Sequence, residues 1–255
     1  MMDKQTPRSL DRTIDEGEIA KFAAMAEEWW DPDGKFRPLH RFNPVRIEFL
    51  RDRIAARFGR DTRSERPLAG LSILDVGCGG GLLCEPMARL GAAVTGIDAT
   101  ERNVEIARAH AAAMALDIDY RFASAADLAS TGATFDAVLN MEVIEHVADR
   151  EAFLDDCARL VRPGGLMFLA TMNRTAKAYL LAIVGAEYVM RWLPRGTHDW
   201  RRFVKPSEMA AWLRRAGITM TDITGVAYDP FKDAWKLAPR DLDVNYIAVA
   251  EKPAA

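Results

Sequence analysis

The sequence predicts an α/β fold, a doubly wound, Rossmann-like and mostly parallel sheet that we expect to have seven strands. Ile73 to Val76 form a short apolar run that breaks into a glycine-rich turn at residues 77–81, and helix-forming residues follow at 82–90. Five such alternations of strand and helix with short links occupy residues 71–171. A chain of 255 residues, 49% of them hydrophobic, is large enough for the full core of such a domain.

Charge and cysteine content exclude several classes of protein. The net charge is -3, which gives no overall field for gripping a polyanion, so nucleic acid is not an expected partner. The three cysteines, Cys78, Cys84 and Cys157, form no C-x-x-C pair. An odd count without an apolar signal segment indicates the reducing cytoplasm rather than a disulfide scaffold.

Two helices are expected before the sheet. Residues 1–14 are polar and aperiodic and predict a loose tail, whereas residues 15–30 have helical spacing of apolar residues and end in the pair Trp29 and Trp30. That pair either docks the helix on the core or lines a pocket. Asn43 and Pro44 resemble the N-cap and first residue of a second helix ending at Gly59, which would put Arg46 in its first turn. Residues 15–70 are therefore predicted to be a helical cap and link, and residues 71–255 the main domain.

Inside the main domain, strands are expected at 92–97, 118–122, 135–139 and 166–171, with helices at 101–114, 150–160 and 206–216. Asp98 ends the second strand, where ligands bind in open parallel sheets, and can accept hydrogen bonds from ribose hydroxyls. Residues 218–230 and 243–252 are expected to close the sheet as an antiparallel pair.

A helical insertion is expected at residues 174–205. Its apolar core, residues 178–186, is much shorter than the roughly 20 residues of a membrane span. Basic residues surround apolar ones, which fits a lid or an interfacial helix, with an ordinary cover of the sheet edge as the alternative. The residues concerned are Lys177, Leu180, Leu181, Ile183, Val184, Arg191, Trp192, Leu193, Arg195, Trp200, Arg201, Arg202 and Lys205.

The glycine spacing selects the class of ligand. Gly77, Gly79 and Gly81 read G-x-G-x-G rather than the G-x-G-x-x-G of a dinucleotide site, and Asp75 lies two residues before the first glycine. A carboxylate so close would repel a diphosphate but suits a ligand with cationic groups. The run ILDVGCGGG resembles motif I of the class I S-adenosylmethionine (SAM)-dependent methyltransferases. An NAD dehydrogenase would need the other spacing.

The resemblance extends beyond motif I. Segments including EEWWDPDGKFRPLHRFNPVR, DVGCGGG, MEVIEHV, LVRPGG and LPRGTHDWRRFVKP resemble the ubiquinone biosynthesis O-methyltransferase family, over most of the chain from Glu18 to Tyr246. The resemblance implies SAM as cofactor and polyprenylated catechol and demethylubiquinol substrates. It also implies cofactor contacts, with Arg46 pairing the methionine carboxylate. The cofactor-binding residues expected are Arg46, Gly77, Gly79, Asp98, Ser124, Ala125 and Met141, with Ser124 standing where many methyltransferases carry an acid for the adenine.

Glu142, Glu145 and His146 follow the fourth strand. At spacing i, i+3 and i+4 they would share one face of a helix start, and two carboxylates with an imidazole can hold a divalent cation. Some relatives are described as using Mg²⁺ at these positions. The alternative is a metal-free site in which the acids favour the helix N-terminus.

The expected chemistry is in-line methyl transfer from a sulfonium to a phenolate oxygen. A phenol has a pKa of about 10, so a base or a metal must assist at neutral pH. We expect His146 as the base, oriented by Glu142 or Glu145, unless a bound cation lowers the phenol pKa instead. Two alternatives remain: methylation of another small hydrophobic phenol, and a non-catalytic SAM-binding subunit of a biosynthetic complex.

The substrate class also predicts where the enzyme works. A polyprenyl tail partitions into the bilayer, so we expect a cytoplasmic protein that binds peripherally to the anionic inner face of the membrane through the insertion. Other proteins of ubiquinone biosynthesis are further expected partners.

Overall fold

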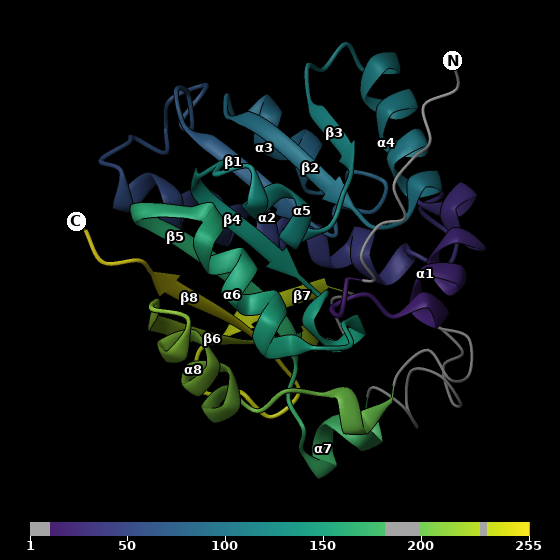
Figure 1. The fold of residues 1–255 in the computed structure, drawn as a ribbon, viewed down its shortest axis with the longest axis vertical. Helices are drawn as coiled ribbons and strands as arrows, with labels where there is room; N and C mark the ends of the chain where they lie inside the picture. The colour runs from purple at the N-terminus through teal and green to yellow at the C-terminus, as the bar shows by residue number, and fades with distance from the viewer. Residues whose placement is uncertain (1–10, 182–198, 230–233, 255) are drawn as a thin grey trace.

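The computed structural model describes residues 11–181, 199–229 and 234–254, and within them it forms one sheet of eight strands in the order β3-β2-β1-β4-β5-β8-β6-β7 (Figure 1). The strands are β1 (Ser72–Val76), β2 (Ala93–Asp98), β3 (Asp119–Phe122), β4 (Phe135–Met141), β5 (Val161–Met172), β6 (Thr219–Asp229), β7 (Ala234–Ala238) and β8 (Asn245–Glu251). The first five are parallel to one another, and β8 pairs antiparallel with both β5 and β6. The predicted fold class is confirmed.

The expected count of seven strands was too low by one. Strand β7 is the additional one, and it pairs antiparallel with β6 at the sheet edge. It has only five residues, all of them exposed or half-buried, so no alternation of apolar and polar residues marks it in the sequence. The two predicted closing strands do pair as β6 and β8, although β7 follows β6 in the chain.

Helices cover both faces of the sheet, as a parallel sheet requires. One buried cluster joins the sheet to α2 (Arg37–Arg57), α3 (Cys84–Arg89) and α4 (Glu101–Ala113), and another joins it to α5 (Ala125–Ser130), α6 (Arg150–Leu160) and α8 (Pro206–Arg215). Neighbouring residues of β1 show the alternation: Ile73 belongs to the first cluster and Leu74 to the second, both fully buried. Each such side chain contributes about 1.5 to 3 kcal/mol by leaving water.

The N-terminal helices differ from the prediction. The first, α1, spans only Glu16–Ala23, with Asp15 accepting hydrogen bonds from the amides of Gly17 and Glu18, and a 3₁₀ turn, η1, follows at Ala26–Glu28. The second, α2, already begins at Arg37, so Pro44 lies inside it and Arg46 is not in its first turn.

Packing explains the longer α2. Proline inside a helix costs about 3 kcal/mol, but α2 buries Phe42, Phe49, Leu50 and Ile54 in the core. Burial of these four side chains, at about 1.5 to 3 kcal/mol each, outweighs the proline. The predicted boundary near residue 71 separates the helical cap from the main domain, although α2 and β1 share one buried core. That boundary stays a prediction.

Only the two ends of the expected insertion are described. Helix α7 (Ala176–Ala178) and the 3₁₀ turn η4 (Trp200–Arg202) flank residues 182–198, so Ile183, Val184, Arg191, Trp192, Leu193 and Arg195 lie outside the described residues. Tyr179, Leu180 and Leu181 are exposed hydrophobic residues. In the part of the chain that the structure describes, no helix is long and apolar enough to cross a bilayer.

Candidate active site

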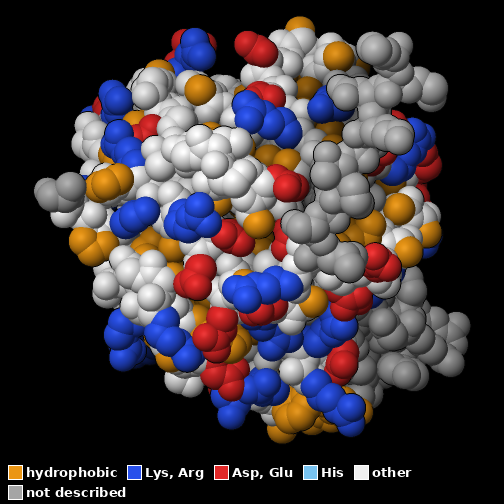
Figure 2. All heavy atoms as spheres, viewed as in Figure 1, with side chains coloured by type: hydrophobic (Ala, Val, Ile, Leu, Met, Phe, Trp, Pro, Cys, Tyr) orange, Lys and Arg blue, Asp and Glu red, His pale blue; other side chains and the backbone are white. Residues whose placement is uncertain are grey.

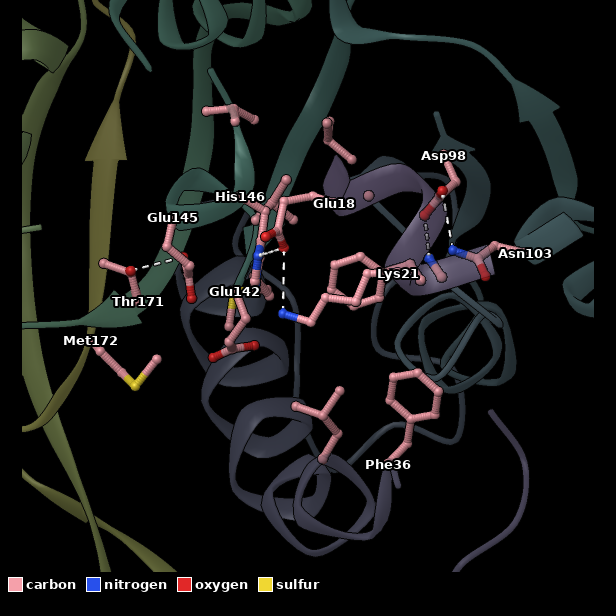
Figure 3. Close-up of a pocket in the computed structure, with 18 of the residues that line it drawn as sticks. Glu18, Lys21, Phe36, Asp98, Asn103, Glu142, Glu145, His146, Thr171 and Met172 are labelled. Atoms are coloured by element: carbon pink, nitrogen blue, oxygen red, sulfur yellow. Dashed lines mark hydrogen bonds and ion pairs between the residues drawn. The ribbon is translucent and has the colours of Figure 1, made fainter. Parts of the chain in front are cut away.

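A cavity of about 730 Å³ opens at the carboxyl ends of the parallel strands, where β1, β2 and β4 end (Figure 3). Helix α1, the glycine turn, the ends of β2 and β4, and the C-terminal strands all contribute to its lining. Its volume is in the range of small-molecule and cofactor sites. Of the predicted site residues, Gly77, Gly79, Asp98, Ser124, Ala125, Met141, Glu142, Glu145 and His146 line it.

The glycine turn needs glycine at two positions in particular. Gly77 has φ +70°, and a Cβ there would meet Val143 Cγ2 at 2.6 Å. Gly79 has φ +54°, and a Cβ there would overlap the Trp29 ring. The amides of Gly77 and Cys78 both donate to the carbonyl oxygen of Ile97 at the end of β2, at 2.8 and 3.0 Å. These contacts fix the turn at the edge of the cavity, with Val143 and Trp29 packed against its glycines.

Asp98 at the end of β2 both lines the cavity and holds its wall. Its carboxylate accepts hydrogen bonds from the Gly79 amide at 2.9 Å, the Thr100 amide at 2.7 Å and Asn103 Nδ2 at 3.2 Å. Burial raises its pKa, and these donors act in the opposite direction. Asp98 thus lies at the cavity with an acceptor group that can also face a ligand hydroxyl.

The expectation that the Asp75 carboxylate faces a cationic ligand is wrong. It is not among the described residues that line the cavity. Its side chain is buried and accepts a hydrogen bond from Cys84 Sγ at 3.3 Å. Burial raises the pKa of Asp75 to about 7. The alternation along β1 explains the misplacement: Val76 faces the cavity, so Asp75 points to the opposite face of the sheet.

Both alternatives for the tryptophan pair hold in part. Trp29 lines the cavity, stacks on Phe36 with ring centroids 3.7 Å apart, and donates from Nε1 to Asn103 Oδ1 at 2.9 Å. Trp30 donates from Nε1 to the Gly80 carbonyl at 2.9 Å, which docks the N-terminal segment on the glycine turn. Asp98, Asn103 and Trp29 thus form one chain of hydrogen bonds across the cavity wall.

Arg46 reaches the site from inside α2. Its side chain is 3% exposed, and it donates from Nη1 to Glu142 Oε2 at 2.5 Å and from Nη2 to Asn43 Oδ1 at 2.8 Å. Nε is buried without a hydrogen-bond partner among the described residues. Arg46 itself is not among the described lining residues, whereas Glu142 is. Burial raises the pKa of the Glu142 carboxyl, and the Arg46 guanidinium opposes that shift.

The predicted shared helix face of Glu142, Glu145 and His146 is wrong. Glu142 has φ +57°, outside any right-handed helix, and only Ile144–His146 form a 3₁₀ turn, η2. Each side chain has a different partner: Glu142 pairs with Arg46, Glu145 accepts from Thr171 Oγ1 at 2.8 Å, and His146 contacts Glu18. In the described ranges, no group of three His, Cys, Asp or Glu residues is arranged to hold a metal ion. As arranged, this donor set does not fit a divalent cation.

His146 is held by helix α1. Its Nδ1 lies 2.7 Å from Glu18 Oε2, and its ring meets the Phe22 ring edge-on at a centroid distance of 5.1 Å (Figure 3). The hydrogen bond with His146 lowers the pKa of Glu18. Glu18, Phe22 and Asn103 are site residues that sequence reasoning missed. The sequence did contain one signal for this contact. Glu18 lies four residues before Phe22, so the carboxylate and the ring share one face of the predicted helix.

Met141, Ser124 and Ala125 also line the cavity. Met141 is the buried last residue of β4. Ser124 caps α5, with its Oγ accepting from the Asp127 amide at 3.1 Å while its own amide donates to Asp127 Oδ2 at 3.0 Å. Ser124, which stands where many methyltransferases carry an acid, is therefore engaged in a capping box with Asp127.

The opposite end of the cavity is apolar and leads toward the insertion. Met172, Val226 and Trp235 line it, and Leu181, 52% exposed, lies where the described chain stops. Lys177 and Asp241 contribute polar groups at this end and form an ion pair at 3.0 Å. The cavity therefore joins a polar half at the glycine turn to an apolar half beside α7.

The chain is similar in sequence to known proteins over most of its length. A family model described as a methyltransferase domain matches residues 74–169. A ubiquinone biosynthesis O-methyltransferase of Mesorhizobium japonicum is 59% identical over 246 residues, covering 96% of this chain and 98% of the relative. A protein of the same description from Parvibaculum lavamentivorans is 60% identical over 240 residues, covering 94% of each chain.

Solved structures share the fold at low sequence identity. A magnesium protoporphyrin IX methyltransferase of Synechocystis, solved with bound S-adenosylhomocysteine, aligns with a TM-score of 0.65 at 21% identity, over 93% of this chain and 100% of its own. A SAM-dependent methyltransferase of Thermotoga maritima aligns with a TM-score of 0.63 at 15% identity, over 92% and 98%. At these identities the likeness concerns the fold alone.

Proposed function

We propose that this chain, which belongs to the ubiquinone biosynthesis O-methyltransferase family, methylates a phenolic oxygen of polyprenylated catechol and demethylubiquinol intermediates with SAM as the donor. Near-full-length identity of 59 and 60% to relatives of that description supports the reaction class. The cavity's division into a polar half at the glycine turn and an apolar half beside α7 is the structural observation that carries the proposal.

The residues at the polar half fit SAM. The turn at Gly77 and Gly79 brings backbone to the cavity, and the Asp98 carboxylate lies at the end of β2, where a ribose hydroxyl is expected. Arg46 supports the expected contact with the methionine carboxylate, because its buried Nε has no acceptor among the described residues. Met141, Ser124 and Ala125 line the same half.

SAM supplies an activated methyl group on a sulfonium and leaves as S-adenosylhomocysteine. The chain's contribution is to hold the acceptor oxygen in line, exclude water and take the phenol proton. His146 lines the cavity between the two halves, and its Nε2 is the atom proposed to accept that proton while the phenolate oxygen takes the methyl group. No step needs a metal.

The apolar half supports a long hydrophobic substituent on the acceptor. Met172, Val226 and Trp235 are apolar, the ionisable Lys177 and Asp241 at this end pair with each other, and Leu181 extends the apolar lining to an exposed position. A polyprenyl chain attached to the ring can then leave the cavity beside α7.

Methylation of a short-tailed demethylubiquinol tests the reaction. Purified protein with SAM is expected to give a product heavier by one methyl group in mass spectrometry, with and without a chelator. A panel of phenols with no, short and long prenyl tails is run alongside. Equal turnover of phenols with and without a prenyl tail would favour another small hydrophobic phenol as the substrate. SAM binding without turnover of any phenol in the panel would favour a non-catalytic subunit. Loss of turnover with chelator would restore the metal hypothesis.

We also propose that the protein binds anionic membranes at the end that carries α7. Figure 2 shows hydrophobic side chains beside Lys and Arg at this end of the molecule. Tyr179, Leu180 and Leu181 are exposed there, and basic residues near an anionic leaflet contribute about 1 kcal/mol each. Lys177 is a weaker contributor than the sequence suggested, because Asp241 and Asp243 already pair with it.

Vesicle co-sedimentation tests this membrane proposal. Binding to anionic vesicles is expected to weaken as salt rises, and replacing Leu180 and Leu181 by Ser is expected to reduce the part that persists at high salt. The variant Lys177→Glu with Arg191→Glu and Arg195→Glu should reduce the salt-sensitive part. If the intact protein does not bind anionic vesicles at low salt, this end of the molecule only covers the edge of the sheet, and the membrane proposal is wrong.

A further inference from the structure

The proposed reaction needs an orienting partner for His146, and the two carboxylates of its own segment do not supply one. A general base needs one ring nitrogen with a free lone pair and a fixed orientation toward the substrate. Glu142 and Glu145, the expected orienting groups, are engaged by Arg46 and Thr171 instead. The carboxylate in contact with the ring is that of Glu18, 128 residues earlier in the chain.

The chemistry of this contact determines the tautomer of the imidazole. The hydrogen bond with His146 lowers the pKa of Glu18, so its carboxylate is ionised at neutral pH and can only accept hydrogen bonds. At 2.7 Å, Nδ1 must therefore carry the proton and donate it to Glu18 Oε2. In a neutral ring this leaves the lone pair on Nε2, the nitrogen that can receive a proton.

We propose that Glu18 is the positioning residue of the methyl transfer: its carboxylate, delivered by α1, fixes the orientation of His146 and keeps its Nε2 free to take the phenol proton. This inference rests on the proposed function. It assigns a catalytic task to the N-terminal helix, which lies outside the parallel sheet (Figure 3). Triads of nucleophile, histidine and carboxylate use the same division of labour, in which the carboxylate holds the ring and the imidazolium that forms.

Four further contacts keep Glu18 in this position. Lys21 lies 3.7 Å and Arg202 4.0 Å from its carboxylate, which favours the ionised form. Arg202 also pairs with Asp15, the N-cap of α1, at 2.7 Å. Phe22, one turn after Glu18, packs edge-on against the imidazole. Helix α1 has no fully buried residue and also packs against α4. Orientation of the base therefore depends on where α1 packs.

Kinetics of matched variants test the proposal. Glu18→Ala is expected to lower kcat by roughly 10- to 100-fold, the range for removing the orienting partner of a functional histidine, with little change in the KM for SAM. Glu18→Gln keeps an acceptor oxygen without the charge and is expected to lose less. Glu16→Ala removes an exposed carboxylate from the same helix and should behave like the unchanged protein. In a His146→Ala background, Glu18→Ala should have no further effect on kcat.

Nitrogen NMR of the imidazoles gives a readout that does not depend on turnover. The His146 resonances, assigned by their loss in His146→Ala, should show a protonated Nδ1 and an unprotonated Nε2, and Glu18→Gln should weaken that preference. A Nε2-protonated ring in the unchanged protein would overturn the proposal. So would normal kcat in Glu18→Ala, or equal losses from it with and without His146. If the unchanged protein itself does not methylate the quinol, the proposed function fails, whereas these outcomes count against Glu18 alone.

Discussion

Breaking the ion pair between Arg46 and Glu142 is expected to lower the free energy of unfolding by an amount that depends on which partner is removed. Glu142→Ala leaves the Arg46 guanidinium, 3% exposed, with Asn43 Oδ1 as its remaining acceptor. Arginine does not lose its proton in proteins, so the charge stays buried and unpaired. Removing one partner of a buried ion pair costs about 3 to 5 kcal/mol, and Glu142→Ala is expected in this range.

The reverse change is expected to cost less. Arg46→Met leaves the Glu142 side chain, which is 24% exposed and can reach water or take up a proton. An unsatisfied group of this kind costs about 1 to 3 kcal/mol. Glu142→Gly provides a control for the backbone: at φ +57° a non-glycine residue costs about 1 to 2 kcal/mol, so glycine should recover about that much relative to alanine.

Urea unfolding of the ligand-free variants at neutral pH measures both costs, because bound SAM would add its own stabilisation. The expected order of stability is unchanged protein, Arg46→Met, Glu142→Gly and Glu142→Ala. Without Arg46, the folded-state pKa of Glu142 lies further above its unfolded value, so the deficit of Arg46→Met should shrink as the pH falls. An Arg46→Met variant less stable than Glu142→Ala would refute this account of the pair.

Other residues of the site give shorter tests. Asp98→Ala is expected to weaken SAM binding by about 1 to 3 kcal/mol in calorimetric titration, because it removes a buried charged acceptor; an unchanged affinity would remove Asp98 from the site. His146→Ala should lower kcat by roughly 10² to 10⁴ with SAM affinity nearly intact, and near-normal turnover would indicate a structural role. Burial raises the pKa of Asp75 from 3.8 to about 7, so the protein loses stability as the pH rises between these values. Asp75→Asn lacks that loss, and its urea midpoint should rise relative to the unchanged protein between pH 5 and pH 8; a constant difference would contradict the buried-acid explanation.

Features of the fold that depend on local pattern could be predicted from the sequence. The parallel strands β1 to β5 follow from apolar runs that alternate with helical segments, and α4 was predicted to within one residue. The glycine turn follows from residue type, since Gly77 and Gly79 have positive φ and leave no room for a Cβ. Asp98 was placed at the cavity because the last residue of a parallel strand lies at the ligand edge.

Local pattern misled where packing outweighed propensity. The sequence predicts a helix start at Pro44, but Pro44 lies inside α2. Burial of the apolar face of that helix compensates for the hydrogen bond that proline cannot make. The i, i+3, i+4 spacing of Glu142, Glu145 and His146 predicted a helix face, yet the chain takes φ +57° at Glu142 and turns as η2.

Neighbouring residues alone therefore predicted the five parallel strands, the glycine turn and the family of this protein, because strand period, glycine geometry and motif spacing are local properties. Which charges meet depends on tertiary packing. Glu18 reaches His146 across 128 positions, and Arg46 reaches Glu142 across 96. No local rule relates residues so far apart, since their pairing is set by how α1 packs against α4 and how α2 packs on the sheet.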